Sequence, residues 1–164
     1  MIVLASTYTP IATTTASGSA STITFSSIPS TYTDLVIVLN GNATTGSTGS
    51  IALQFNSDTG SNYSYTRLLG DGSAASSARG SNTTATYIGD TGTDRAVFIV
   101  SLNNYSNSTT YKTALSRTNT ANTATMATVG LWRNTAAINR VDLSTTTSTF
   151  AAGSTFTLYG IKAA

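Results

Sequence analysis

The sequence contains no cysteine, no histidine and no glutamate. Without cysteine there can be no disulfide framework, thiol nucleophile or cysteine-ligated zinc. Without histidine there is no imidazole ligand for a metal and no conventional Ser-His-Asp triad. These absences remove most of the side chains that enzymes use near neutral pH, so we expect a protein that is not an enzyme and carries no cofactor.

Charged residues are also scarce. Lys, Arg, Asp and Glu together make up 9% of the chain, against roughly 25% in ordinary soluble domains. The formal net charge is only +2, and the arginines are scattered along the chain rather than clustered. Because nucleic-acid binding needs many Lys or Arg contacts to phosphate, nucleic acid is not an expected partner.

Long apolar runs are missing too. The longest are Leu35–Leu39 and Ala96–Val100, far below the roughly 18 residues of a membrane-spanning helix. The segment Met1–Pro10 has no basic flank and too short an apolar run for a secretory signal peptide. We therefore expect a soluble protein with no membrane partner.

The residues that are abundant favour β-structure. Ser and Thr fill about a third of the chain, and Val, Ile, Tyr and Phe suit a pleated sheet, whereas the helix formers Glu, Lys and Gln are nearly missing. Short apolar or alternating segments recur between clusters of Gly, Asn, Ser and Asp, and no composition shift marks a second domain. The predicted strands are Ile2–Thr9, Ser21–Phe25, Asp34–Asn40, Ile51–Asn56, Tyr63–Leu69, Ala85–Ile88, Arg95–Leu102, Thr110–Arg117, Ala124–Trp132, Ile138–Leu143 and Ser154–Ile161.

These segments predict one all-β domain over residues 1–164, a two-sheet antiparallel β-sandwich of about eight to ten strands wound as a jelly roll. Leu35–Leu39 is apolar on both faces, which indicates a central strand covered on each side. In Ser154–Ile161, Phe156 and Leu158 share one face and polar residues the other, which indicates a strand buried on one side.

The stretches between the predicted strands are expected to be turns and loops. Asn40–Gly49 and Gly70–Ser77 have no large apolar side chain to anchor them, so we expect both to be exposed and mobile. Pro29 is expected to fix the turn between the strands that end at Phe25 and begin at Asp34.

Few residues could carry chemistry. A glycosidase would need two carboxylates, which Asp90 with Asp94 or Asp58 with Asp71 could supply, although aspartate in Gly- and Asn-rich segments is more often a turn former. The two lysines are Lys112 and Lys162, and the second is expected to be solvated near the C-terminus.

One loop could hold a metal. Asn56, Asp58 and Asn62 offer oxygen ligands at alternate positions, but the loop lacks the glycine and closing glutamate of an EF-hand. The simpler interpretation is a hairpin loop between the strands Ile51–Asn56 and Tyr63–Leu69. We therefore predict no metal site.

Four residues are candidate partner contacts. Tyr105, Tyr111 and Trp132 could form an aromatic surface that stacks on a sugar or anchors an interface, with Arg133 beside them. The alternative for Trp132, the only tryptophan, is a position at a strand end, partly buried against the sandwich.

Assembly is suggested by the edges of the predicted sheets. Monomeric β-proteins guard their edge strands with lysine, other charges or proline, and this chain has two lysines, two prolines and few charges. We therefore expect some edges or faces to be covered by another copy or by a neighbouring protein.

Three strings, Ile28–Ile37, Leu53–Ser64 and Phe150–Ile161, resemble small β-rich structural proteins of tailed bacteriophages, including cyanophages. The resemblance implies a jelly-roll module, commonly a homotrimer, that decorates or cements a capsid. It implies the major capsid protein as partner and the capsid surface of the virion as location. The alternative is a tail-fibre or receptor-binding head that recognises a host-surface glycan.

The absence of histidine leads to a first prediction. No side chain present has an unperturbed pKa between about 5 and 8, so assembly and thermal stability are expected to change little across that range. Sedimentation and thermal denaturation at intervals of pH test this, and a sharp loss of oligomer between those values would contradict it.

Overall fold

The computed structural model describes residues 7–45, 49–120, 122–146 and 148–162, which form twelve strands. None of the described residues forms a helix that could cross a membrane. The strands are β1 (Tyr8–Thr15), β2 (Thr22–Phe25), β3 (Asp34–Gly41), β4 (Gly49–Phe55), β5 (Tyr63–Gly70), β6 (Ala75–Thr83), β7 (Thr86–Thr91), β8 (Ala96–Asn103), β9 (Lys112–Thr120), β10 (Ala124–Trp132), β11 (Val141–Thr145) and β12 (Thr155–Ile161).

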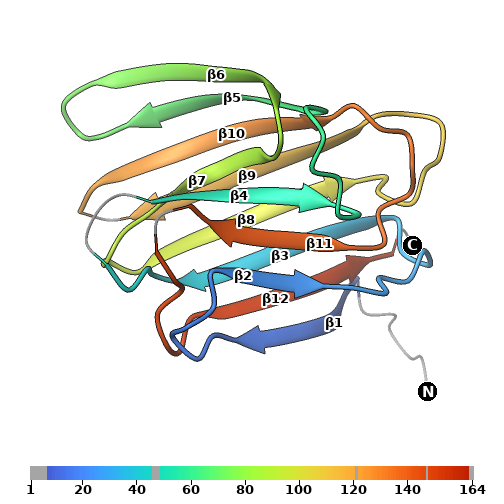
Figure 1. Ribbon diagram of the computed structural model, residues 1–164, viewed down its shortest axis with the longest axis horizontal. Coiled ribbons are helices and arrows are strands. Elements are labelled where there is room, and N and C mark those ends of the chain that lie inside the picture. The colour runs from blue at the N-terminus through green and yellow to red at the C-terminus, as the bar shows by residue number, and fades with distance from the viewer. Residues whose placement is uncertain (1–6, 46–48, 121, 147, 163–164) are drawn as a thin grey trace.

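The strands form two antiparallel sheets of unequal width. The larger has eight strands in the order β1-β12-β3-β8-β9-β10-β5-β6, and the smaller has four in the order β2-β11-β4-β7. In Figure 1 the smaller sheet lies in front of the middle of the larger one, and the β5–β6 hairpin extends beyond it at the top. The all-β class and the two-sheet antiparallel sandwich are confirmed, with twelve strands rather than the eight to ten expected.

A single hydrophobic core lies between the sheets. Leu35, Ile37 and Leu39 of β3 are at most 1% exposed, and Val36 on the other face is also buried. Because β3 is paired with β12 and β8, the central position predicted for Leu35–Leu39 is confirmed. In β12, alternate residues are buried and half-buried, which confirms the predicted one-sided strand.

Three predicted segments were wrong. Gly70–Ser77, expected to be a loop, contains the start of β6. The first strand, β1, continues to Thr15 rather than ending at Thr9, and residues 2–6 of that prediction lie outside the described residues. The Asn40–Gly49 segment is not uniformly exposed, because Ala43 is 1% exposed and forms a β-bridge with Phe150.

The loop after β4 was also predicted wrongly. It does not close a hairpin, since β4 belongs to the smaller sheet and β5 to the larger, so the loop crosses between them. Pro29 does lie in the connection between β2 and β3, and its carbonyl accepts a hydrogen bond from the Tyr105 hydroxyl.

The sandwich is thinnest where β7 packs on β9 and β10. A Cβ added to Gly130 of β10 would lie 2.1 Å from Thr86 Oγ1 of β7, and one added to Gly89 of β7 would lie 2.4 Å from Thr118 Oγ1 of β9. Such distances are too short for real side-chain contacts, so only glycine fits at these two positions. At these two points the layer between the strands therefore has room for small side chains only.

Hydroxyl groups fill this thin layer. Ser116 Oγ and Thr118 Oγ1 donate hydrogen bonds of 2.7 and 2.9 Å to the Ile88 carbonyl of β7, which compensates for burying them. Successive residues of a strand point to opposite faces. The larger apolar residues that alternate with these hydroxyls, Leu115 on β9 and Val129 on β10, consequently point away from the core.

At the other end of β10, Asp58 anchors the loop that crosses between the sheets. Its carboxylate accepts hydrogen bonds from Trp132 Nε1 at 2.7 Å, Asn62 Nδ2 at 2.9 Å and the Gly60 backbone N–H at 2.9 Å. The Trp132 hydrogen bond is the main cause of a lowered Asp58 pKa, against a smaller opposing effect of burial. Tyr63 stacks on Trp132, with ring centroids 6.3 Å apart, and burial raises the pKa of Tyr63 to about 12.

Removing the Asp58 carboxylate is expected to destabilise the fold. Asp58→Ala leaves the indole N–H of buried Trp132 without its acceptor, which we expect to lower the free energy of unfolding by about 2–3 kcal/mol. Because the folded pKa lies below the unfolded value of 3.8, this contribution is present above that pH and lost as pH falls through the folded pKa. The difference between wild type and variant is therefore expected to shrink in acid.

Chemical denaturation at pH 7 and at pH 3 measures both effects. Asp94→Ala, at an exposed position, is the matched control and is expected to behave like wild type. Equal stability of the Asp58→Ala and Asp94→Ala variants at pH 7 would contradict this role.

Candidate interaction surface

The outward side of the larger sheet carries an unusual concentration of apolar side chains. The pairing places Leu115 of β9 directly opposite Val129 of β10, and Leu68 of β5 directly opposite Ala127 of β10. Leu68, Leu115 and Val129 are 62%, 51% and 52% exposed. We define the outer face as the following outward-pointing residues of β5, β8, β9 and β10: Leu68, Val97, Ile99, Leu115, Arg117, Ala127, Val129 and Leu131.

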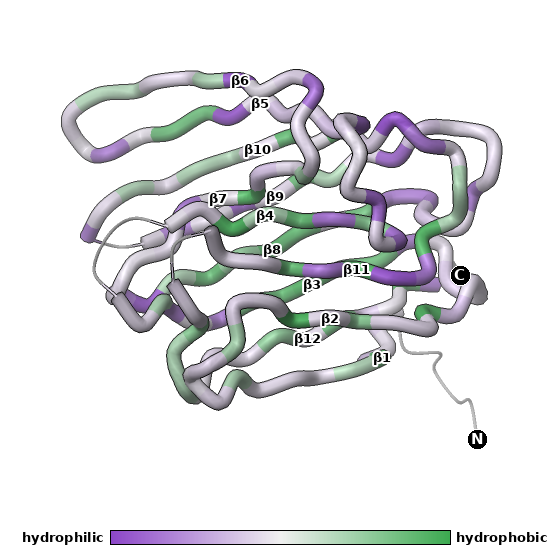
Figure 2. Tube along the Cα trace, in the orientation of Figure 1, coloured by the Kyte–Doolittle hydropathy of each residue, from purple (hydrophilic) through white to green (hydrophobic). Residues whose placement is uncertain are grey.

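Open grooves run between these side chains. One, of about 450 Å³, is lined by Leu68, Ala127 and Arg117 among others. A second, of about 260 Å³, is lined by Val97, Ile99 and again Arg117. Arg117 therefore lies where two grooves meet, in the middle of an apolar surface. Figure 2 shows apolar positions recurring along β8 of this sheet.

The charge on the outer face is unpaired. Arg117 is exposed and makes no hydrogen bond or ion pair with any described residue. Arg79 of β6 lies opposite Thr66 on the same side of the sheet and has no such partner either. No aspartate occupies an outward position of β5, β8, β9 or β10.

The smaller sheet presents a different surface. Arg140 donates to both carboxylate oxygens of Asp142 at 2.8 Å, and Thr24 Oγ1 donates to Asp142 Oδ1 at 2.5 Å. Its charges are thus satisfied within the chain. The larger sheet combines exposed leucine and valine with an unsatisfied guanidinium, which is the composition of an interface rather than of a free surface.

The aromatic surface expected from the sequence does not exist. Trp132 is 1% and Tyr105 0% exposed, so neither ring can contact a partner in this conformation, while Tyr111 is 56% exposed. The strand-end position of Trp132 agrees with the alternative interpretation, although its burial is nearly complete.

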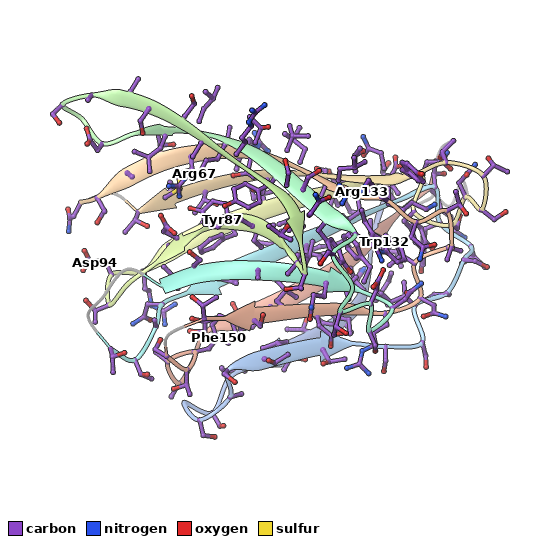
Figure 3. The ribbon with its side chains drawn as sticks, turned by 45° about the horizontal axis from the view of Figure 1, so that its top comes forward. Arg67, Tyr87, Asp94, Trp132, Arg133 and Phe150 are labelled. Atoms are coloured by element: carbon purple, nitrogen blue, oxygen red, sulfur yellow. The ribbon has the colours of Figure 1, made fainter. Side chains whose placement is uncertain are left out.

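Arg133 donates to the Ser61 carbonyl and to Asn82 Oδ1, both at 2.8 Å, so it ties the β4–β5 loop to the end of β6. Figure 3 shows Trp132 and Arg133 together, away from Asp94.

Of the two predicted carboxylate pairs, the structure brings only one together. Asp71, Asp90 and Asp94 line one pocket of about 360 Å³, so Asp90 and Asp94 come together while Asp58 and Asp71 do not. Asp90 accepts from Ser50 Oγ at 3.2 Å and from Arg67 Nη1 at 3.5 Å. Asp71 forms a turn, where backbone N–H groups of Ala74 and Ser73 lower its pKa to about 2. Asp71 is thus held ionised, which does not suit a general acid.

The metal and amine candidates have structural contacts instead. The Asp58 carboxylate is occupied by the donors described above, and Asn62 directs its NH₂ group rather than its oxygen at it. In the described part of the chain, no group of three or more acidic residues is arranged to hold a metal ion. Lys112 is 2% exposed, donates to the carbonyls of Thr110 and Thr135 at 2.7 and 2.9 Å, and has its pKa lowered by desolvation.

Comparison with known proteins adds no assignment. No family model, no curated protein and no solved structure matches the chain.

The outer face is expected to be dispensable for folding. Leu115→Thr and Val129→Thr remove apolar groups that are already half in water, so each is expected to shift the melting temperature by no more than a few degrees. Gly130→Ala adds a single methyl group to the thin layer and is expected to cost about 1–3 kcal/mol. Thermal denaturation of the three variants measures the decrease in melting temperature. A larger decrease for Leu115→Thr than for Gly130→Ala would contradict the prediction.

Proposed function

We propose that this protein is a virion structural protein that decorates or cements a capsid. The outer face of the larger sheet is its contact with the outer surface of the shell formed by the major capsid protein. The observation that carries the proposal is an apolar sheet face, more than half exposed at Leu68, Leu115 and Val129, around an unpaired Arg117.

Burial of the outer face contributes a favourable free energy of binding. Covering the three half-exposed side chains contributes roughly 1 kcal/mol each, because complete burial of a leucine or valine is worth about 1.5–3 kcal/mol. The contact gains little from long-range charge attraction, since few charges are present. It is therefore expected to resist salt, as a permanent structural contact requires.

Arg117 adds a requirement on the partner. A guanidinium buried without a counterion is strongly unfavourable, and the outer face has no carboxylate to offer it. The capsid surface opposite Arg117 must therefore present an aspartate or glutamate within a largely apolar patch. This feature fixes the register of the contact.

The strand order supports a jelly-roll winding. Strands β1-β12-β3-β8 and β2-β11-β4-β7 are two runs of four in which β1, β2, β3 and β4 alternate between the sheets. That alternation is typical of an eight-stranded jelly roll. The remaining strands form two inserted hairpins, β5–β6 and β9–β10, which widen one sheet and carry much of the outer face.

The alternatives lose support. A glycan-binding head depended on the aromatic surface of Trp132 and Tyr105, which are buried. A glycosidase would need a carboxylic acid that stays protonated near neutral pH, whereas the pKa values of Asp58 and Asp71 are lowered. In the other pair, Asp90 already accepts hydrogen bonds from Ser50 and Arg67. A structural role needs neither an exposed aromatic surface nor a protonated carboxylic acid.

The contact can be tested on capsids that lack this protein. Wild type is expected to co-sediment with them, and Leu115→Asp combined with Val129→Asp is expected to weaken binding by about 30-fold or more, because two charges are buried and Arg117 can pair with only one of them. Thr22→Asp introduces one such charge on the exposed surface of the smaller sheet and is expected to bind like wild type.

Two results would overturn the proposal. One is equal binding by the outer-face variant and the Thr22→Asp control. The other is imaging of labelled protein at the tail tip alone, since a cement protein occurs in hundreds of copies on the head.

A further inference from the structure

Strand β6 is the outermost strand of the larger sheet, and its free edge is open. Among the described strands it pairs with β5 only. Seven of its nine positions are exposed and the other two, Gly80 and Thr83, are half-buried, so none is buried. The backbone N–H and C=O groups that point away from β5 therefore have no strand to pair with, as the upper margin of Figure 1 shows.

The composition of β6 does not explain why it is a strand. From Ala75 to Ser81 every residue other than Arg79 is Ala, Ser or Gly, and alanine and glycine are depleted in strands. Most of β6 has intermediate hydropathy in Figure 2.

The hairpin is held firmly despite this composition. The Tyr65 ring packs over Gly80, where an added Cβ would lie 2.5 Å from it. Tyr65 also packs against Tyr87 of β7 at 5.3 Å between centroids, and Arg67 donates to the Tyr87 hydroxyl at 2.9 Å. Arg67 and Tyr87 lie together beneath the hairpin in Figure 3. The free edge of β6 is thus presented on a fixed support.

The other described edges are protected. In β1, Pro10 removes a donor and the register shifts between Pro10 and Ala12. Strand β2 is four residues long, and β7 is interrupted by a register shift opposite Ile51. In β6 the only shift lies at its end, opposite Tyr63 and Ser64, which leaves Ala75–Ser81 in unbroken register. Prolines, bulges, charges and short length are the usual defences against edge pairing, and over Ala75–Ser81 the only one of these in β6 is the charge of Arg79.

We propose that β6 pairs antiparallel with the β6 of a second copy, across a two-fold axis at Ala78, to join two larger sheets into one. This places Ser77 opposite the partner subunit's Arg79. The outward-pointing residues of both copies then lie on the same face of the joined sheet. An axis at Arg79 would instead place two guanidinium groups opposite one another, which is destabilising. The self-association does not depend on the virion role.

The same edges decide between a dimer and a ring. A ring would need β6 to pair with a different edge of the next copy, and the opposite edge of the sheet, β1, is blocked by Pro10 and its bulge. The isologous two-fold pairing has no such obstacle. A dimer is therefore expected in place of the homotrimer that the family resemblance implies.

The pairing is expected to be concentration-dependent. A ladder over Ala75–Ser81 is roughly 24 Å long at about 3.4 Å per residue. It covers less than the roughly 1,200 Å² of a stable interface, which indicates a dissociation constant in the micromolar range or above. Measurements must therefore extend to high protein concentration.

Sedimentation equilibrium of the full chain measures the dissociation constant of the dimer. Two variants introduce opposite charges at position 77. Ser77→Lys faces the partner's Arg79 twice per dimer and is expected to raise the dissociation constant about threefold or more, whereas Ser77→Asp is expected to lower it by a similar factor. Ala12→Lys and Ala12→Asp, at an exposed position of β1, are matched controls and are expected to leave it unchanged.

A cysteine variant tests the axis itself. Because the chain has no cysteine, Ala78→Cys introduces one thiol that meets its own copy at the axis, and mild oxidation is expected to give a covalent dimer. Ala12→Cys is expected to stay monomeric under the same conditions. A monomer at all concentrations, a trimer, or a dimer equally affected by Ser77 and Ala12 substitutions would overturn the proposal.

Discussion

The close approach of β7 to β9 and β10 determines how this molecule distributes its apolar residues. Gly89 and Gly130 leave no room for a Cβ, and serine and threonine lie beside them, with Ser116 bonded to a β7 carbonyl. Alternation along a strand then directs the residues between them outward. Leu115 and Val129 are exposed for this reason, and the proposed capsid contact depends on the same geometry.

Composition and alternation were sufficient to predict the fold class and most strands, because the core strands β3 and β12 follow the ordinary pattern of apolar residues inside. They were not sufficient where that pattern is inverted. In β9 and β10 the buried positions opposite β7 include Ser116, Thr118 and Gly130, so the exposed leucine and valine look like core residues in the sequence. Strand β6 was missed because backbone pairing with β5, rather than any side-chain preference, makes it a strand.

The candidate site was predicted least well. Trp132 and Tyr105 were chosen because large aromatics anchor many interfaces, yet the Asp58 carboxylate and the Pro29 carbonyl give their polar atoms buried partners. Such partners come from loops distant in the sequence, and spacing along the chain cannot reveal them. The expectation of covered edges or faces rested on the scarcity of charge and proline, and it stays a prediction.

The buried position of Trp132 also determines what its fluorescence reports. The only indole in the chain is 1% exposed and bonded to a carboxylate, on the inward side of β10, whereas the proposed contacts involve the outward side of that sheet and the distant edge of β6. Its emission therefore follows the integrity of the loop between β4 and β5 and does not respond to binding. One spectroscopic signal can thus monitor unfolding in a binding experiment without being altered by the partner.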